Sequence, residues 1–75
     1  MFLYRAVGST LKNGATVIAL GTYNQDLYVL TFWCKEYVTE YVTWLLDEQG
    51  NTILGHYFKD IFSAVKDFKE RLVLK

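Results

Sequence analysis

Hydrophobic and polar positions alternate along most of the chain, in short runs that polar residues interrupt. Runs rich in valine, isoleucine, threonine, tyrosine and phenylalanine lie at Ala15–Tyr23, Leu27–Lys35 and Thr52–Phe58. A further run ends at Leu46, after a connection at Lys35–Tyr37. Because β-branched and aromatic side chains pack well on a pleated surface, each run predicts a strand.

The polar segment between the last two runs gives the sharpest local prediction. In Asp47–Asn51, polar residues and then a glycine separate two apolar stretches. This order is typical of a type I turn at Glu48-Gln49 followed by Gly50 in the left-handed region. Asn51 is then expected to lie opposite Asp47.

Continuing the antiparallel register away from this turn assigns side chains to the two faces of the sheet, because strand residues alternate between them. The predicted pairs are Leu46 with Thr52, Trp44 with Leu54, and Val42 with His56. One face is then predicted to carry Val42, Trp44, Leu46, Leu54, His56 and Phe58. The other is predicted to carry Thr39, Tyr41, Thr43, Leu45, Ile53, Gly55 and Tyr57. The first face is the more apolar, and we expect it to form the floor for a helix.

The first part of the chain predicts a further hairpin. Phe2–Lys12 is interpreted as a strand, interrupted by a bulge at Gly8-Ser9, with a short helix over residues 2–7 as the alternative. Asn13-Gly14 predicts a type I′ turn, because both residues tolerate positive φ. Asn24-Gln25-Asp26 predicts the next turn.

The segment after residue 60 has the periodicity of an amphipathic helix. Asp60 is expected to cap its N-terminus, because a short acceptor side chain can bind the free amides of the first turn. The apolar face is predicted to consist of Ile61, Ala64, Val65, Phe68 and Leu72. Charged residues, including the i,i+4 pair Asp67 and Arg71, are predicted to face solvent. The expected structure is a single domain over residues 1–75 with an α+β fold: a four- to five-stranded, mainly antiparallel sheet with one C-terminal helix packed on one face.

The run Leu27–Lys35 is apolar at both sets of alternating positions, which is typical of a central strand covered on both faces. The sequence predicts only one helix to cover it, so a symmetric partner, and therefore a homodimer, is expected to cover the second face. Composition agrees with this, because 52% hydrophobic and 17% aromatic residues exceed what a two-layer fold of 75 residues can easily bury.

Charge and cysteine content narrow the function classes. Eight basic residues balance eight acidic ones without a basic run, which argues against a nucleic-acid partner. Cys34 is the sole cysteine, so no intramolecular disulfide can form, and a cytoplasmic location is expected. A charged leader with an apolar core is not visible, and no apolar run approaches the ~20 residues that span a bilayer, so no membrane association is expected.

Neither the histidine nor the cysteine belongs to a motif for catalysis or metal binding. His56 lacks the further ligands of a metal site, and Asp60 and Glu40 are the carboxylates considered as its neighbours. A free cysteine such as Cys34 is more often a small buried apolar residue than a reactive thiol. We therefore predict no enzyme activity, no metal and no cofactor. The opposite hypothesis requires His56 or Cys34 to lie in a cleft beside a carboxylate.

The aromatic residues of the middle strands are the predicted partner-binding residues. They are Trp33, Tyr37, Tyr41 and Tyr57, with Thr43 beside them. One hypothesis is packing within the core and between strands. The other is an interface, since tyrosine and tryptophan provide contact area at low entropic cost.

The string GHYF at 55–58, followed by DIFSAVKDFKER at 60–71, resembles small uncharacterised proteins carried by bacterial phages and mobile elements. The likeness extends over residues 41–71. Such proteins, anti-CRISPR proteins among them, are often inhibitors of host defence. The resemblance therefore implies a protein that binds and occludes a host defence protein. The alternatives are an oligomer that sequesters a small molecule such as a nucleotide between aromatic residues, and a structural dimeric module.

Overall fold

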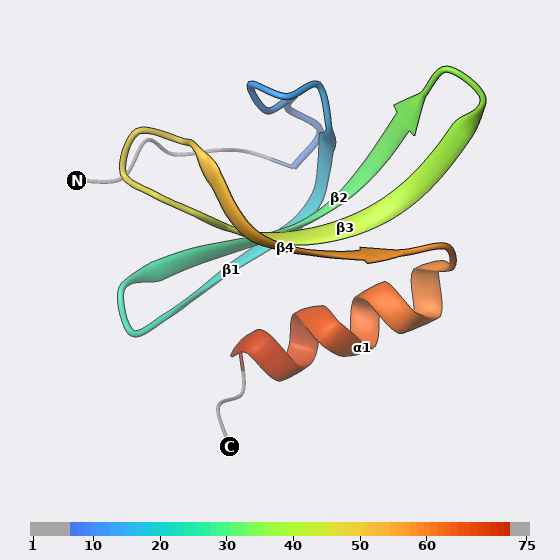
Figure 1. The fold of residues 1–75 in the computed structure, drawn as a ribbon. Coiled ribbons are helices and arrows are strands. Elements are labelled where there is room, and N and C mark those ends of the chain that lie inside the picture. The colour runs from blue at the N-terminus through green and yellow to red at the C-terminus, as the bar shows by residue number, and fades with distance from the viewer. Residues whose placement is uncertain (1–6, 73–75) are drawn as a thin grey trace.

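The computed structural model describes residues 7–72, which form one antiparallel sheet and one helix (Figure 1). The elements in chain order are β1 (Thr16–Tyr23), β2 (Asp26–Lys35), β3 (Val38–Leu46), β4 (Thr52–Phe58) and α1 (Ile61–Leu72). The strands lie in the same order in the sheet, and α1 packs on one face of it. The α+β prediction with a C-terminal helix is confirmed, with four strands.

Both faces of β2 are buried by the chain itself in the middle of the strand, over residues 27–31. On one face, Leu30 packs against Ala64 and Phe68 of α1. On the other face, a separate core gathers around the loop that precedes β1. Its buried members are Leu11, Ala15, Val17, Leu27, Val29, Val42, Trp44 and Leu46. The twisted sheet curves around this loop on the side away from α1 (Figure 1). The middle of β2 therefore needs no symmetric partner to cover it, and that reason for expecting a dimer was wrong.

The turn between β3 and β4 has the predicted geometry. The amide of Asp47 donates to the carbonyl of Asn51 at 3.0 Å, the amide of Gly50 donates to the carbonyl of Asp47 at 3.0 Å, and Gly50 has a φ of 83°. The Asp47 carboxylate accepts hydrogen bonds from the amides of Gln49 and Asn51 at 2.9 and 2.8 Å. The bonds from Asn51 are the main cause that lowers the pKa of Asp47.

The register beyond this turn differs from the prediction after its first pair. Leu46 lies opposite Thr52 as expected, but His56 lies opposite Thr43, because β4 contains an extra residue. Leu54, with a φ of 54°, stands where the register shifts, so the irregularity has the character of a β-bulge. The shift moves His56 and Phe58 to the other face of the sheet. The predicted floor of the helix was therefore wrong: Val42, Trp44 and Leu46 face away from α1, which packs instead on Ala19, Tyr28, Leu30, Tyr41 and Phe58.

The segment before β1 is a loop rather than the predicted strand over the part that the structure describes, residues 7–12. It touches the edge of β1 through an isolated bridge between Thr10 and Thr16. The predicted bulge is present: the amide of Gly8 donates to the carbonyl of Val17, whose amide donates to the carbonyl of Ser9, and Gly8 has a φ of 93°. The predictions for residues 2–6 lie outside the described residues.

The Asn13-Gly14 turn forms with a different geometry from the predicted type I′. Only Gly14 has a positive φ, of 95°, and its amide donates to the carbonyl of Leu11 at 2.9 Å. The turn is therefore centred on Lys12-Asn13, with Gly14 as the left-handed residue that follows. The side chain of Asn13 explains the difference, because its Oδ1 accepts the amide of Ala15 at 3.0 Å, a bond within the turn.

The helix begins at the predicted residue and turns its predicted apolar side chains toward the sheet, with one exception among its charged residues. Asp60 Oδ1 accepts the amide of Ser63 at 2.9 Å, which confirms the cap, and the bonds from Ser63 are the main cause that lowers the pKa of Asp60. Asp67 and Arg71 form the expected i,i+4 pair at 3.4 Å, but they do not face solvent: their side chains are only 20% and 10% exposed. Both turn toward the sheet.

The turn between β1 and β2 predicts a stabilising substitution. Gln25 has a φ of 70° and Asn24 a φ of 53°, so both central residues are left-handed. That conformation costs a non-glycine residue about 1–2 kcal/mol, and glycine avoids this cost. Glycine also has more backbone freedom in the unfolded chain, which cancels about 0.5–1 kcal/mol of the gain in stability. We expect Gln25→Gly to raise the melting temperature by roughly 4 °C. The control is Gln49→Gly, at a position without positive φ, which is expected to lower it; equal effects of the two would contradict the interpretation.

Candidate interaction surface

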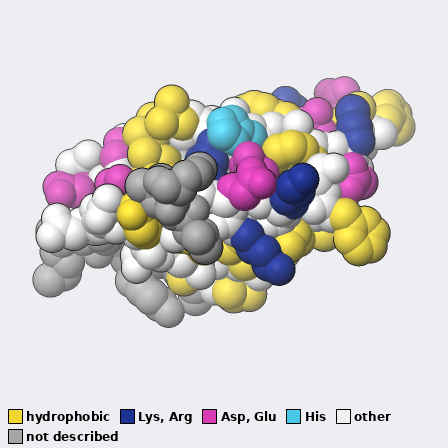
Figure 2. Space-filling model, turned by 90° about the horizontal axis from the view of Figure 1, so that it is seen from below, with side chains coloured by type: hydrophobic (Ala, Val, Ile, Leu, Met, Phe, Trp, Pro, Cys, Tyr) yellow, Lys and Arg dark blue, Asp and Glu magenta, His cyan; other side chains and the backbone are white. Residues whose placement is uncertain are grey.

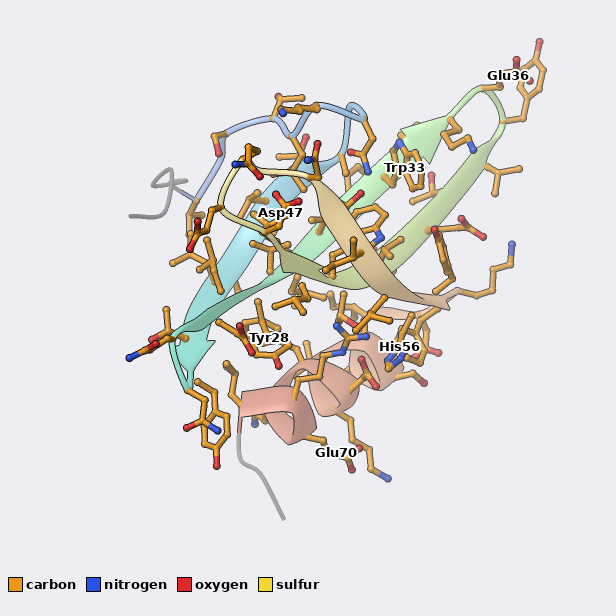
Figure 3. The ribbon with its side chains drawn as sticks, turned by 60° about the vertical axis from the view of Figure 1, so that its left-hand side comes forward. Tyr28, Trp33, Glu36, Asp47, His56 and Glu70 are labelled. Atoms are coloured by element: carbon orange, nitrogen blue, oxygen red, sulfur yellow. The ribbon has the colours of Figure 1, made fainter. Side chains whose placement is uncertain are left out.

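The hairpin of β2 and β3 extends beyond both neighbouring strands. The pairing of β1 with β2 begins at Thr16 opposite Phe32, and the pairing of β3 with β4 ends at Tyr41 opposite Phe58. Residues 33–40, called the arm below, therefore project past the sheet as two strands (Figure 1). Glu36 lies at the tip of the arm (Figure 3).

The outer part of the arm exposes large apolar side chains. Tyr37 at the turn is 100% exposed and Val38, the first residue of β3, is 47% exposed. Cys34 is exposed as well. Glu36, which precedes Tyr37 in the turn, has a φ of 52°, a backbone conformation that costs a non-glycine residue energy. The paired strands already hold the backbone of this turn, so binding costs mainly the side-chain freedom of Tyr37.

Three aromatic rings fix the base of the arm on the face away from α1. Trp33 and Trp44 lie 5.3 Å apart between ring centroids, and Tyr57 lies 6.1 Å from Trp44 and 6.4 Å from Trp33. The Lys35 ammonium group lies 4.5 Å from the Trp33 ring centroid, a cation–π distance. Trp44 is buried and Tyr57 is 54% exposed. The cluster therefore anchors the arm through Trp44 and presents Tyr57 to solvent.

The structure does not bring the five predicted partner-binding residues onto one surface. Tyr37 lies at the tip of the arm, and Trp33 and Tyr57 lie at its base on the face away from α1. Tyr41 lies on the opposite face, packed with the core beneath α1 and 5.7 Å from the Phe32 ring. Thr43 is 0% exposed, so it cannot contact a partner. Val38 was not predicted, because its exposure depends on where β1 and β4 end.

A polar network around Asp67 fastens α1 to the sheet. Thr43 Oγ1 on β3 donates to Asp67 Oδ2 at 2.5 Å, and His56 Nδ1 on β4 lies 3.0 Å from both carboxylate oxygens. Arg71 pairs with the same carboxylate and also donates to the carbonyl of Leu54 at the bulge. Figure 2, which views the α1 side, shows the histidine beside an acidic side chain.

The charges of this network perturb two groups. Burial is the largest influence on Asp67 and raises its pKa, but the hydrogen bonds from Thr43 and His56 and the nearby Arg71 outweigh it, so the pKa of Asp67 is lowered. For Arg71, burial lowers the pKa of the guanidinium group against the opposing attraction of Asp67. Asp67 therefore remains an anion that contacts Thr43 on β3, His56 on β4 and Arg71 on its own helix.

The sequence did not pair His56 with Asp67; Asp60 and Glu40 were the carboxylates considered. Asp60 caps the helix and Glu40 lies 3.7 Å from Lys59. A histidine oriented by a carboxylate is one part of a nucleophilic site. The nearest hydroxyl in the network, that of Thr43, donates to Asp67 rather than to His56. Within residues 7–72, no group of three or more histidine, cysteine, aspartate or glutamate side chains is placed to hold a metal ion. The network is best explained as a clamp for the helix.

Comparison of the chain with protein-family models, curated proteins and solved structures found no match. Of the helical segments in the described part of the chain, none is long and apolar enough to cross a membrane.

Proposed function

We propose that the protein is a non-catalytic binding protein that occludes a protein partner, with the arm as its principal contact. The observation that carries the proposal is the full exposure of Tyr37 at the tip of a hairpin that extends past its neighbouring strands. Val38 beside it and Tyr57 at the base add apolar surface. A projecting hairpin of this kind fits into a cleft or lies across the mouth of a site, which is how occlusion acts.

The shape of the arm supports a binding role in energetic terms. Tyrosine gains contact area while losing the freedom of only two side-chain torsions, which is why it is frequent among binding hot spots. The rings of Trp33 and Trp44 hold the base in place before binding. The resemblance to phage-carried inhibitors supplies the proposed partner, a host defence protein.

Photo-crosslinking from the tip of the arm tests this function. We expect the protein with Tyr37 replaced by p-benzoylphenylalanine to crosslink one host protein, and the same group at Lys69 on α1 not to do so. Unlabelled wild-type protein should compete for that crosslink, and Tyr37→Ala should compete at least tenfold less well, since a hot-spot truncation costs about 2 kcal/mol. Equal competition by Tyr37→Ala and wild type would remove the arm from the proposal.

The homodimer expected from the sequence stays a separate proposal. Its support is the set of exposed large apolar side chains beyond the arm: Val7, Ile18, Phe32, Ile53, Leu54 and Phe62. On the α1 side, hydrophobic side chains stand apart between charged ones rather than in one patch (Figure 2). Light scattering after size exclusion decides it: a mass near 8.8 kDa at micromolar concentration would contradict the dimer.

The nucleotide-sequestering alternative requires an oligomer with a deep pocket at a subunit boundary, lined by tyrosine or tryptophan with Arg5 or a lysine nearby. Two hollows of about 320 and 380 Å³ lie at opposite ends of the described sheet, and neither is lined by an aromatic side chain. The support for a protein partner is the fully exposed Tyr37 at the tip of the arm.

A further inference from the structure

The end of the sheet opposite the arm contains a hollow of about 320 Å³ between two turns. It is called the turn pocket below. Its lining includes Gln25 and Asp26 from the β1–β2 turn, Asp47 and Glu48 from the β3–β4 turn, and Leu45 with Ile53 from the strands between them. In Figure 3, Asp47 lies far from Glu36 at the tip of the arm. The turn pocket is thus separate from the surface proposed above.

One side of the turn pocket is apolar and open. Leu45 and Ile53 are partners in the β3–β4 register, so their side chains lie next to each other on one face of the sheet. Ile53 is 43% exposed, so the described part of α1, which ends at Leu72, does not cover it. An aliphatic chain laid along this pair would remove apolar surface from water.

The rim of the turn pocket is negatively charged, and the positive charge of Lys12 acts on one of its carboxylates, that of Asp47. Three carboxylates line the turn pocket, and none of its described lining residues is basic. Asp47 is engaged by Gln49 and Asn51 of its own turn. Asp26 and Glu48 form no side-chain hydrogen bond or ion pair with any described residue. These two carboxylates come from different turns, so the fold, rather than a local acidic run, brings them to the same hollow.

We propose that the turn pocket receives one basic side chain, arginine or lysine, of a protein partner. Such a side chain has an aliphatic stem that matches Leu45 and Ile53 and a cationic head that matches Asp26 and Glu48. The volume lies at the lower end of the range for ligand sites, about 300–1,000 Å³, so it suits a single side chain better than a whole cofactor. A bare metal ion would leave the apolar side without a role.

The turn pocket would then be a second contact, in addition to the arm, in the protein complex of the proposed function. One exposed ion pair contributes only about 0.2–1 kcal/mol, so the pocket is expected to bind an isolated basic side chain weakly and, within the complex, to select partners that carry one at the right place. Because arm and pocket lie at opposite ends, substitutions in one are not expected to alter the other. A negative crosslinking result therefore does not decide whether the turn pocket binds a basic side chain. A negative result at the turn pocket likewise does not decide whether the arm binds a partner.

The test is a titration of the ¹⁵N-labelled full chain with acetyl-Gly-Arg-Gly-amide, followed by amide chemical shifts. The matched probe has norleucine in place of arginine. We expect saturable shifts at Gln25, Asp26, Glu48 and Ile53 with the arginine peptide and not with the norleucine peptide. In the double variant Asp26→Asn, Glu48→Gln, the affinity should fall about fivefold or more, as loss of two exposed ion pairs implies.

The control variant is Glu70→Lys, which changes the net charge by the same amount as the double variant, but on the exposed side of α1. It should bind the arginine peptide as the wild type does; an equal loss would show that overall charge alone is responsible and would overturn the proposal. Ile53→Thr provides a second variant that leaves the carboxylates in place, and unchanged affinity there would contradict the apolar contact.

Two other occupants are distinguishable in the same experiment. If Lys75→Gln shifts the pocket amides in the free protein and strengthens peptide binding, the occupant is the chain's own C-terminus. If the pocket amides shift with protein concentration alone, the occupant is a second copy. Either result would overturn the proposal of a partner side chain, as would the absence of saturable shifts with the arginine peptide.

Discussion

Asp67→Ala is expected to lower the free energy of unfolding by about 3 kcal/mol. The fully buried hydroxyl of Thr43 loses its acceptor, which costs about 1–3 kcal/mol for an unsatisfied buried polar group. The guanidinium group of Arg71, with a side chain only 10% exposed, loses its ionic partner as well. His56 is half-exposed and adds little, because water replaces the lost bond.

Urea denaturation monitored by tryptophan fluorescence measures this loss. Glu70→Ala is the control, because it removes an exposed carboxylate from the same helix and is expected to change stability by less than about 0.5 kcal/mol. The variant Thr43→Val removes the hydroxyl that needs Asp67. In a double-mutant cycle, Asp67→Ala should therefore cost less in the Thr43→Val background than in the wild type. Strict additivity would contradict a direct bond between the two side chains.

The lowered pKa of Asp67 also predicts how stability depends on pH. A carboxyl group whose folded pKa lies below its ordinary value of 3.8 stabilises the fold above that value, and the contribution is lost as the pH falls through the folded pKa. The stability difference between wild type and Asp67→Asn is therefore expected to be largest near neutral pH and to shrink below about pH 4. Unfolding measured from pH 7 to pH 2.5 tests this; a difference that grows in acid would contradict it.

The parts of the fold that were predicted correctly have local chemical causes. The Asp47–Asn51 turn needs only a glycine at one position and an acceptor side chain at another, and both are visible in five residues. The cap at Asp60 and the apolar face of α1 likewise depend on residues within one or two turns of each other. The bulge at Gly8 was found because glycine marks a position where positive φ has no steric cost.

The incorrect assignments have causes that are not local. Leu54 adopts a positive φ although leucine gives no indication of it, and the resulting shift reverses the faces of His56, Tyr57 and Phe58. The partners of Asp67 lie 24 residues away on β3 and 11 residues away on β4, so periodicity within the helix assigned it to solvent. The register shift at Leu54 also places Tyr57 on the face opposite Tyr41 and Thr43, which divides the predicted interface. Val38, by contrast, is exposed because two other strands stop short of it.

Gly55→Ala is expected to destabilise the fold by about 3 kcal/mol, through the aromatic cluster that anchors the arm. A Cβ atom at residue 55 would lie 2.3 Å from Trp44 Nε1 and 2.8 Å from its Cδ1, too close for either atom to remain in place. The indole is rigid, buried and packed edge-on against Trp33 and Tyr57, so it can move only by disturbing both rings. Overpacking of a well-packed core typically costs about 1–3 kcal/mol, and occasionally more.

Gly21→Ala is the matched control, because the added Cβ would meet Leu72 Cδ1 at 2.8 Å. That atom is the far end of a flexible side chain near the end of α1, so a change of rotamer relieves the contact and the cost should stay below about 1 kcal/mol. Combining Gly55→Ala with Trp44→Phe should recover part of the loss, since the smaller ring vacates the space that the new methyl group needs. Urea denaturation of the four proteins measures both effects. A larger loss in Gly21→Ala than in Gly55→Ala would show that the indole, and with it the base of the arm, is not the rigid anchor that the packing of Trp33, Trp44 and Tyr57 implies.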